Sequence, residues 1–262
     1  MWENFNIKYR ESYSSPIDDF HEHDYYEINF IVSGNVRILL PDSTDEGTES
    51  RILLTAPGTP HFVSCRQDML YKRYYLLFSK EFIKDFISEE NPLSNLLEKP
   101  WKIVSISSSQ ENFCRMLISR LEHETNMLRQ KLLVMYLLSY IDEFANNDST
   151  IKMPSYIMEA MTFIEEHYNE KIVASDLAQK LHIGRTTLMT NFKKYTNLTL
   201  ADFINQCRLK NALVLLEEDK KEAEIAEKCG FGDVSGFIRA FKNYFKTTPR
   251  KYIKEKGSGR GE

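Results

Sequence analysis

Hydrophobic positions are spaced differently in successive parts of the chain. Between about residue 20 and residue 78, short runs rich in Ile, Leu, Val, Tyr and Phe alternate with turn-forming segments. The runs are "YYEINFIVSG" (25–34), "VRILLP" (36–41), "RILLTAPG" (51–58) and "YKRYYLLFS" (71–79), and they are punctuated by Gly34, "PDSTDEG" and "APGTP". This pattern predicts an all-β sheet or barrel.

From residue 107 to about residue 146, apolar residues recur mostly three or four positions apart, which is typical of a helix with one apolar stripe. The hydroxyl groups of "SSSQ" (107–110) can cap the start of that helix. Two interpretations of the stripe stay open: it joins two chains in a dimer, or it packs on the β domain of its own chain. Its apolar residues are Phe113, Met116, Leu117, Leu121, Leu128, Leu132, Met135 and Ile141.

A polar segment with no periodicity, "FANNDSTIKMPSY" (144–156), separates this helix from the rest of the chain. We place an interdomain linker at residues 146–154. At 262 residues, the chain is long enough for two domains that each bury a core.

Beyond Pro154 the chain is helical and repeats itself. "FKKYTNLTLADFI" (192–204) aligns with "FKNYFKTTPRKYI" (241–253) at an offset of 49, and "LAQKL" (177–181) aligns with "IAEKC" (225–229) at an offset of 48. Each copy predicts a short helix, a sharp turn permitted by glycine, and a second helix. The turn glycines are Gly184 in the first copy and the pair Gly230 and Gly232 in the second.

The second helix of each copy is expected to bury one face and to leave the other free. Leu188 and Phe192 form the buried pair in one copy, and Phe237 and Phe241 in the other. A free face of this kind can enter a major groove, whereas a plain helical bundle would leave it solvated. The free positions are Arg185, Thr186, Met189 and Thr190 in the first copy, and Val234, Ser235, Arg239 and Lys242 in the second.

Length and charge support this interpretation. "TLADFINQCRLKNALVLLEE" (199–218) predicts a connecting helix of about 27 to 30 Å, which could hold two reading helices in successive major grooves on one face of a duplex. Residues 152–262 carry 19 Lys and Arg and 15 Asp and Glu, which is a net charge of +4. Residues 1–151 carry 15 Lys and Arg and 23 Asp and Glu, which is a net charge of −8. We expect phosphate contacts at Lys193, Lys194, Lys242, Lys246, Arg250 and Lys251.

Residues 155–254 resemble the DNA-binding domain of AraC/XylS-type transcription regulators, and "IAEKCGFGDVSGFIRAFKNYFKTTPRKYI" matches the pattern of its second unit. The resemblance implies double-stranded DNA as a partner, a homodimer, and contact with RNA polymerase. The chain departs from the family pattern at Gly184, where a Ser cap is common, and at Gly236, which offers no side chain. The base-facing positions that the resemblance implies are Thr186, Met189, Thr190, Val234, Ser235, Gly236 and Arg239.

The first half is similar to a cupin-like effector domain, because "HEHDYYEINFIVSG" (21–34) and "APGTPH" (56–61) match the two cupin motifs. In cupin enzymes the positions of His21, His23, Glu27 and His61 supply metal ligands. We also expect residues 21, 23, 25 and 27 to share one face of a strand. Three interpretations stay open for the histidines: an effector pocket to which Tyr25 contributes, a divalent metal site, or structural and surface roles.

Nothing else in the sequence supplies a nucleophile or a base with an orienting partner, and His123, His167 and His182 are expected on the surface or in turns. No apolar run approaches the roughly 18 to 20 residues of a membrane span. The scattered cysteines and the absence of a hydrophobic leader predict a cytoplasmic protein. We expect no cofactor other than the divalent metal that stays open for the histidines.

The sequence therefore predicts an α+β multidomain, ligand-responsive transcription regulator, not an enzyme. The alternative is a metal-dependent cupin enzyme fused to a DNA-binding module. The predicted parts are a cupin-like sensor at 1–106, a helical dimerisation segment at 107–145, a linker at 146–154, a double helix-turn-helix domain at 155–254, and a flexible tail at 255–262.

Overall fold

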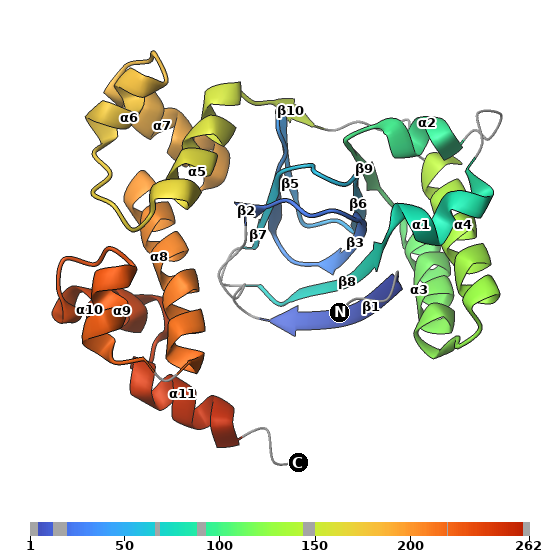
Figure 1. Cartoon of the computed structure of the whole chain (residues 1–262). Coiled ribbons are helices and arrows are strands. Elements are labelled where there is room, and N and C mark those ends of the chain that lie inside the picture. The colour runs from blue at the N-terminus through green and yellow to red at the C-terminus, as the bar shows by residue number, and fades with distance from the viewer. Residues whose placement is uncertain are drawn as a thin grey trace. The chain divides into compact units, whose positions relative to one another are not determined.

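A computed structural model describes residues 5–12, 20–65, 69–87, 93–143, 150–218 and 220–258. The chain forms two compact units, unit 1 from Met1 to Met153 and unit 2 from Pro154 to Glu262, and Figure 1 labels most of their helices and strands. The boundary lies at the end of the predicted linker, of which residues 146–149 are outside the described part.

Unit 1 contains two five-stranded antiparallel sheets, with strand orders β1-β8-β3-β6-β9 and β10-β5-β4-β7-β2. We call them the first and the second sheet. Their strands are β1 (Phe5–Ser12), β2 (Phe20–His21), β3 (Tyr26–Ser33), β4 (Val36–Leu39), β5 (Ser43–Gly47), β6 (Arg51–Thr55), β7 (His61–Cys65), β8 (Tyr71–Phe78), β9 (Trp101–Ser105) and β10 (Ile151–Lys152).

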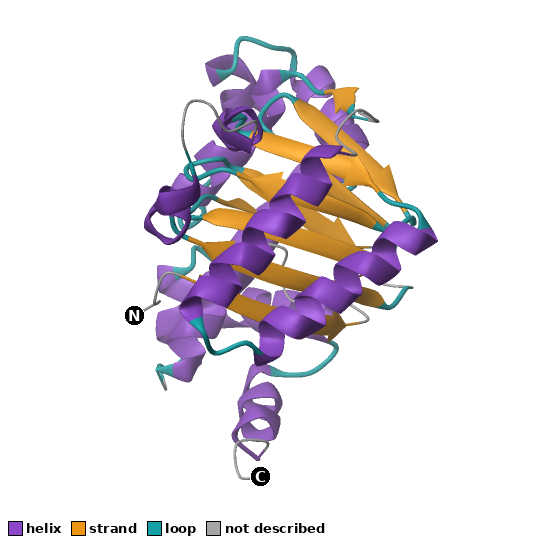
Figure 2. Cartoon of the chain, turned by 90° about the vertical axis from the view of Figure 1, so that its right-hand side faces the viewer, coloured by secondary structure: helices purple, strands orange, loops and turns teal. Residues whose placement is uncertain are grey.

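The two faces of the first sheet bury different sets of side chains, because successive residues of a strand point to opposite faces. Ile28 and Phe30 of β3 belong to one core cluster with Val134 and Leu138 of α4. Two long helices, α3 (Ser108–His123) and α4 (Met127–Glu143), cross this outer face in Figure 2. Ile31 belongs instead to a cluster that joins both sheets. The short helices are α1 (Lys80–Ile83), η1 (Lys84–Phe86) and α2 (Leu93–Glu98).

The four apolar runs form strands β3, β4, β6 and β8, so the prediction of a β domain is confirmed. Within the described ranges, no strand of one sheet pairs with a strand of the other, and the sheets do not close into a barrel through hydrogen bonds. The prediction of a turn at "PDSTDEG" holds only for Pro41 and Asp42, which Leu40 and Ser43 flank with mutual backbone hydrogen bonds, since Ser43–Gly47 is β5. Its polar residues are held inside the fold: Asp45 forms a buried ion pair with Arg51, and the Thr44 hydroxyl donates to the Ile38 carbonyl at 3.0 Å.

The predicted helical stretch contains two helices and a break. α3 ends before Glu124, and the Asn126 side chain then accepts from the backbone N–H of Arg129 at 3.1 Å, which starts α4. The prediction of a single apolar stripe was therefore wrong, and even within α4 its residues lie on different faces. Met135 is 8% exposed, whereas Leu128 and Leu132 are 60% and 50% exposed.

Unit 2 contains two helix-turn-helix units, α6–α7 and α9–α10, that are joined by one long helix (Figure 1). This confirms the repeat. Its helices are α5 (Ser155–His167), α6 (Ala174–Lys180), α7 (Arg185–Thr196), α8 (Leu200–Glu217), α9 (Glu222–Lys228), α10 (Val234–Phe245) and α11 (Pro249–Ser258). α11 continues into the segment predicted as a tail, of which residues 259–262 lie outside the described part.

Equivalent positions of the two units adopt the same special backbone conformations. Gly230 has a positive φ of 73°, and its equivalent at the offset of 48 is His182, with a φ of 54°. The prediction that Gly184 makes the first turn was wrong, since its φ of −72° is accessible to any residue. Asn197 and Lys246, at the offset of 49, end α7 and α10 in the left-handed region.

Arg208 of α8 connects the two helix-turn-helix units. Its guanidinium donates to the carbonyls of Tyr168 and Glu170, at 2.8 and 2.9 Å, in the loop before α6. The same guanidinium lies 5.8 Å from the ring centre of Phe231, in the turn after α9. These contacts tie both units to α8.

Candidate functional sites

The four residues of the cupin-like pattern converge in unit 1. Potential ligand atoms of His21, His23, Glu27 and His61 all lie within 4.8 Å of one another. We call these residues the histidine cluster. The prediction that residues 21–27 form one strand was wrong: β2 ends at His21 in the second sheet, and β3 begins at Tyr26 in the first. The cluster therefore draws on both sheets and on the segment between them.

Hydrogen bonds to the backbone orient two of the imidazole rings. The Nδ1–H of His23 donates to the Tyr25 carbonyl at 2.9 Å, and the Nδ1–H of His61 donates to the Thr59 carbonyl at 2.9 Å. The Nε2 atoms are turned toward Glu27 Oε2, at 3.1 Å for His23 and 4.0 Å for His61. Both rings thus present Nε2 to one buried carboxylate.

The cluster holds Glu27 as an anion although the residue is only 4% exposed. Burial alone raises the pKa of Glu27, but the hydrogen bond with His23 and the nearby imidazoles hold that pKa below its usual value. Burial lowers the pKa of His61 to about 4, although the negative charge of Glu27 acts in the opposite direction and raises this pKa. His61 is therefore neutral at pH 7. At that pH, the hydrogen bond with His23 is the contact that stabilises the Glu27 carboxylate.

Tyr25 lies beside the cluster, as the sequence predicted. Its ring stacks on the imidazole of His23, with 3.9 Å between ring centres and 7° between the planes. Burial and the charge of Glu27 raise the pKa of Tyr25, so its hydroxyl is protonated at neutral pH. A half-buried aromatic ring of this kind can stack on a small ligand.

Sequence reasoning missed a group of buried polar residues on the first sheet. Asn29, Thr55 and Arg73 lie on the face of the sheet that carries Glu27, because Glu27 pairs with Thr55 and Ile31 pairs with Arg73. Among the described residues, no hydrogen-bond partner exists for the Asn29 amide, the Thr55 hydroxyl or Nη1 of Arg73. A signal for these residues was present in "YEINFIV" (26–32), where Asn29 is a polar residue within an otherwise apolar strand.

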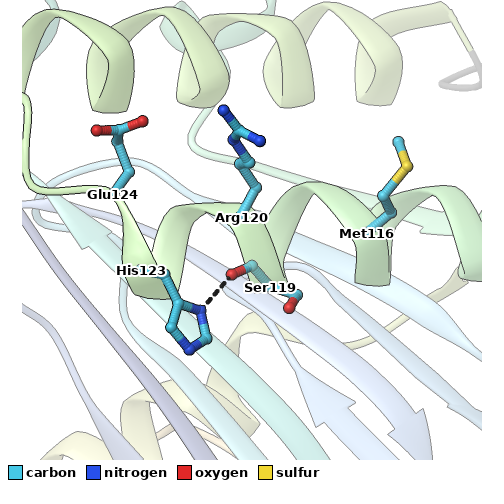
Figure 3. A pocket seen from close by; sticks show the side chains of 5 residues that line it. All are labelled: Met116, Ser119, Arg120, His123 and Glu124. Carbon is cyan, nitrogen blue, oxygen red and sulfur yellow. Dashed lines mark hydrogen bonds between the residues drawn. The ribbon is translucent and has the colours of Figure 1, made fainter.

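A depression on α3 is a weaker candidate (Figure 3). Most of its lining side chains are exposed, and they come from one helix and the residue that follows it. The Nδ1–H of His123 donates to the Ser119 carbonyl at 2.8 Å, so this polar group is already engaged within the helix. The depression lacks the buried, convergent polar groups of a small-molecule site. It is lined by Met116, Ser119, Arg120, His123 and Glu124.

In unit 2, α7 buries one face and exposes the other, as predicted. Leu188 and Phe192 are fully buried, whereas Met189 is 43% exposed. The backbone N–H groups at the start of α7 receive no side-chain cap, because Gly184 occupies the capping position. The exposed residues are Arg185, Thr186, Met189, Thr190, Lys193 and Lys194.

The corresponding face of α10 differs in detail. Ser235 and Arg239 are exposed, whereas Val234 and Gly236 are half-buried. The carboxylate of Asp233 accepts from the N–H of Gly236 at 2.6 Å and caps the helix. Val234 also lines a crevice with Glu222 and Arg250, so it is a less accessible position than the sequence suggested.

The residues expected at phosphates are exposed on α7, α10, α11 and the residues next to them: Lys193, Lys194, Lys242, Lys246, Arg250 and Lys251. Their contacts within the protein include a cation–π contact of Lys194, whose Nζ lies 4.9 Å from the ring centre of Tyr195. Arg250 Nε lies 3.4 Å from a carboxylate oxygen of Glu222, and the Lys246 ammonium donates to the Asn243 carbonyl at 2.7 Å.

Comparison with protein families agrees with both halves of the structure. Residues 9–138 match the AraC-like ligand binding domain, and residues 177–255 match a helix-turn-helix domain. The chain belongs to the AraC family of transcription regulators. Its ligand-binding half contains the histidine cluster, and its DNA-binding half contains the exposed faces of α7 and α10.

This AraC-family regulator is similar to the Msm operon regulatory protein of Streptococcus mutans. The two are 28% identical, and the alignment covers 88% of this chain and 85% of that protein. The transcriptional regulatory protein HptR of Staphylococcus aureus is 32% identical over 38% of this chain and 40% of that protein. Among solved structures, ToxT from Vibrio cholerae is aligned over 96% of this chain and 98% of that chain, at 15% identity and a TM-score of 0.41. None of the described helices of the regulator is long and apolar enough to cross a membrane.

Proposed function

We propose that this AraC-family regulator binds a small polar effector in its cupin-like first unit, beside the histidine cluster and Tyr25. The observation that carries the proposal is the set of buried polar groups around the cluster. Buried polar groups almost always have a partner, and a bound ligand supplies one. The Asn29 amide, the Thr55 hydroxyl and Nη1 of Arg73 lack such partners within the described residues. A sugar or a small organic acid has the hydroxyl or carboxylate groups to pair with them.

The same proposal assigns sequence reading to α7 and α10. α8 has 18 residues and is therefore about 27 Å long, which is comparable with one duplex turn of about 34 Å. A connector of this length supports the placement of α7 and α10 in successive major grooves. The polar side chains that fit base edges are Arg185, Thr186, Thr190, Ser235 and Arg239, and the surrounding lysines fit phosphates.

A dimer is part of this proposal. On α4, Leu128, Leu132 and Tyr136 are each at least half exposed and four residues apart, so they form one apolar row on the surface of unit 1. Two such rows packed against each other would remove this surface from water. The effector would then favour one arrangement of sensor and reader over another, through a difference in affinity, and RNA polymerase is a further partner of the DNA-bound form.

The DNA assignment is tested by selecting duplexes from a random library with the purified chain and measuring affinities for the selected site. Replacing Arg239 with Ala should weaken binding about 5- to 100-fold and relax the preference at one base pair, because a bidentate contact to guanine contributes about 1–3 kcal/mol. Lys242→Ala should weaken binding to every sequence to a similar degree.

Lys228→Ala is the matched control, because Lys228 is exposed on α9 and forms an ion pair with Glu224 at 2.9 Å. Unchanged affinity and sequence preference for Arg239→Ala would show that α10 is not a reading helix. A metal-dependent enzyme is not favoured as an alternative, because the similar proteins named above are regulators.

A further inference from the structure

We propose that the histidine cluster is a binding site for one divalent first-row transition-metal ion, with His21, His23, Glu27 and His61 as its ligands. The proposal concerns the region where the effector is expected, but it does not require the effector. It rests on the geometry of the four side chains and on the polar atoms that they leave without partners.

The first observation is the orientation of the rings. The Nδ1–H of His23 and the Nδ1–H of His61 each donate to a backbone carbonyl, so the Nε2 atoms of both rings face Glu27. In the neutral His61 ring, Nε2 carries the lone pair. Histidines that bind metals almost always anchor their second nitrogen in this way, because the bond fixes the tautomer and the ring.

The second observation is the contact between His23 and Glu27. Nε2 of His23 and Oε2 of Glu27 are 3.1 Å apart. A lone pair and a carboxylate oxygen repel at this distance unless a positive charge lies between them. That charge is either a proton or a metal ion, and only a metal ion can also engage His21 and His61.

The third observation is the spacing around His61. Its Nε2 is buried and has no hydrogen-bond partner among the described residues, although Glu27 Oε2 is only 4.0 Å away. Two ligands that are each about 2.1 Å from a tetrahedral zinc ion are about 3.4 Å apart. The distances of 3.1 and 4.0 Å from Glu27 to the two histidines lie on either side of this value. Small side-chain shifts would therefore bring these atoms into a coordination shell.

The donor set selects the class of ion. Three imidazole nitrogens and one carboxylate oxygen suit zinc, iron, cobalt or nickel, whereas calcium and magnesium prefer oxygen ligands alone. The ligands come from the second sheet (His21 and His61), the first sheet (Glu27) and the segment between them (His23). A bound ion would therefore link the two sheets and stabilise unit 1.

The test titrates the full chain with Co(II) after chelator treatment and dialysis, and follows the visible absorption of the ion together with the unfolding temperature. We expect one Co(II) per chain, a visible spectrum typical of nitrogen and oxygen ligands, displacement by Zn(II), and a higher unfolding temperature that chelator reverses.

Two variants remove ligands at different depths, His61→Gln in the core and His21→Gln at a half-buried position, so a folding failure of one leaves the other informative. Each should lower the Co(II) affinity at least 10-fold. His123→Gln is the control, because His123 is exposed on α3 and bonded within its helix. The absence of Co(II) binding by the folded chain, or unchanged binding by both ligand variants, would overturn the proposal.

The metal site and the effector pocket can fail separately. If the chelated chain is stabilised by an organic metabolite and binds no Co(II), the metal proposal is wrong and the effector proposal stands. If one Co(II) binds through the cluster and no metabolite from a broad screen stabilises either form, the metal proposal stands and the effector assignment is wrong.

Discussion

His61 shows how the surroundings of one residue set its chemistry. The side chain is fully buried, and burial moves its pKa from an ordinary value of 6.5 to about 4. A buried neutral histidine beside an ionised carboxylate is ready to accept a cation without first releasing a proton. An exposed histidine such as His123 has the same chemical groups but no such environment.

The shifted pKa of His61 predicts how stability depends on pH in the chelated protein. Because the folded state disfavours protonation, the contribution of His61 is fully present above about pH 6.5 and is lost as the pH falls toward 4. Between pH 7 and pH 5 the free energy of unfolding of unit 1 should fall by about 2 kcal/mol from this residue. Urea unfolding at several pH values measures the effect.

The variant His61→Gln lacks this titration, so its stability should change less between pH 7 and pH 5. The lowered pKa of Glu27 adds a separate loss at more acidic pH, below the usual range for a glutamate. Equal pH dependence of the variant and the natural chain would contradict the assignment to His61.

At the scale of elements, the two helix-turn-helix units reach the same geometry with different residues. The turn after α9 contains Gly230, where an added Cβ would lie 2.4 Å from the Asn169 carbonyl oxygen. The first unit holds His182 in the same left-handed conformation. Helix capping differs as well, since Asp233 caps α10 and no side chain caps α7.

Replacing Gly230 with Ala should destabilise unit 2 by at least about 2 kcal/mol. The left-handed conformation costs a non-glycine residue about 1–2 kcal/mol, and the contact with Asn169 forces the loop before α6 to move. Thermal unfolding of the chain measures the loss. Gly232→Ala is the control, because nothing lies within 4 Å of its added Cβ and its φ is not positive. Equal losses in the two variants would rule out this explanation.

At the scale of the molecule, the two sides of the α3–α4 hairpin differ: one side packs on the first sheet, and the other side of α4 exposes an apolar row. The residues of α3 and α4 that face the first sheet complete its core, as Cys114, Ile118 and Leu138 do at full burial. The opposite side of α4 keeps Leu128, Leu132 and Tyr136 in solvent. One helical hairpin can therefore cover the sheet and offer a surface to a second chain.

Replacing Leu132 with Glu should convert the proposed dimer into monomers at micromolar concentration, because two charges would be buried in the apolar contact. Light scattering coupled to size exclusion measures the mass. Val214→Glu is the control, because Val214 lies on α8 in unit 2 and its exposed fraction of 56% is close to the 50% of Leu132. A dimeric Leu132→Glu variant, or a monomeric natural chain, would contradict the assignment of α4.

The sequence by itself determined the division into a β-rich first half and a doubled helical second half. Local spacing carries this information, because apolar alternation predicts strands and the offsets of 48 and 49 expose the repeat. It also determined which side chains of α7 are buried, since the helical period fixes the face on which Leu188 and Phe192 lie.

Only the tertiary structure decided how these pieces meet. His21 and Glu27 were expected on one strand, yet they belong to different sheets and still converge, because the segment between them passes from one sheet to the other. The polar strand β5 lies inside the fold, where Asp45 forms a buried ion pair with Arg51 of the following strand. The polar interior at Asn29, Thr55 and Arg73 depends on strand register. Register and pairing arise between residues far apart in sequence, so local patterns do not contain them.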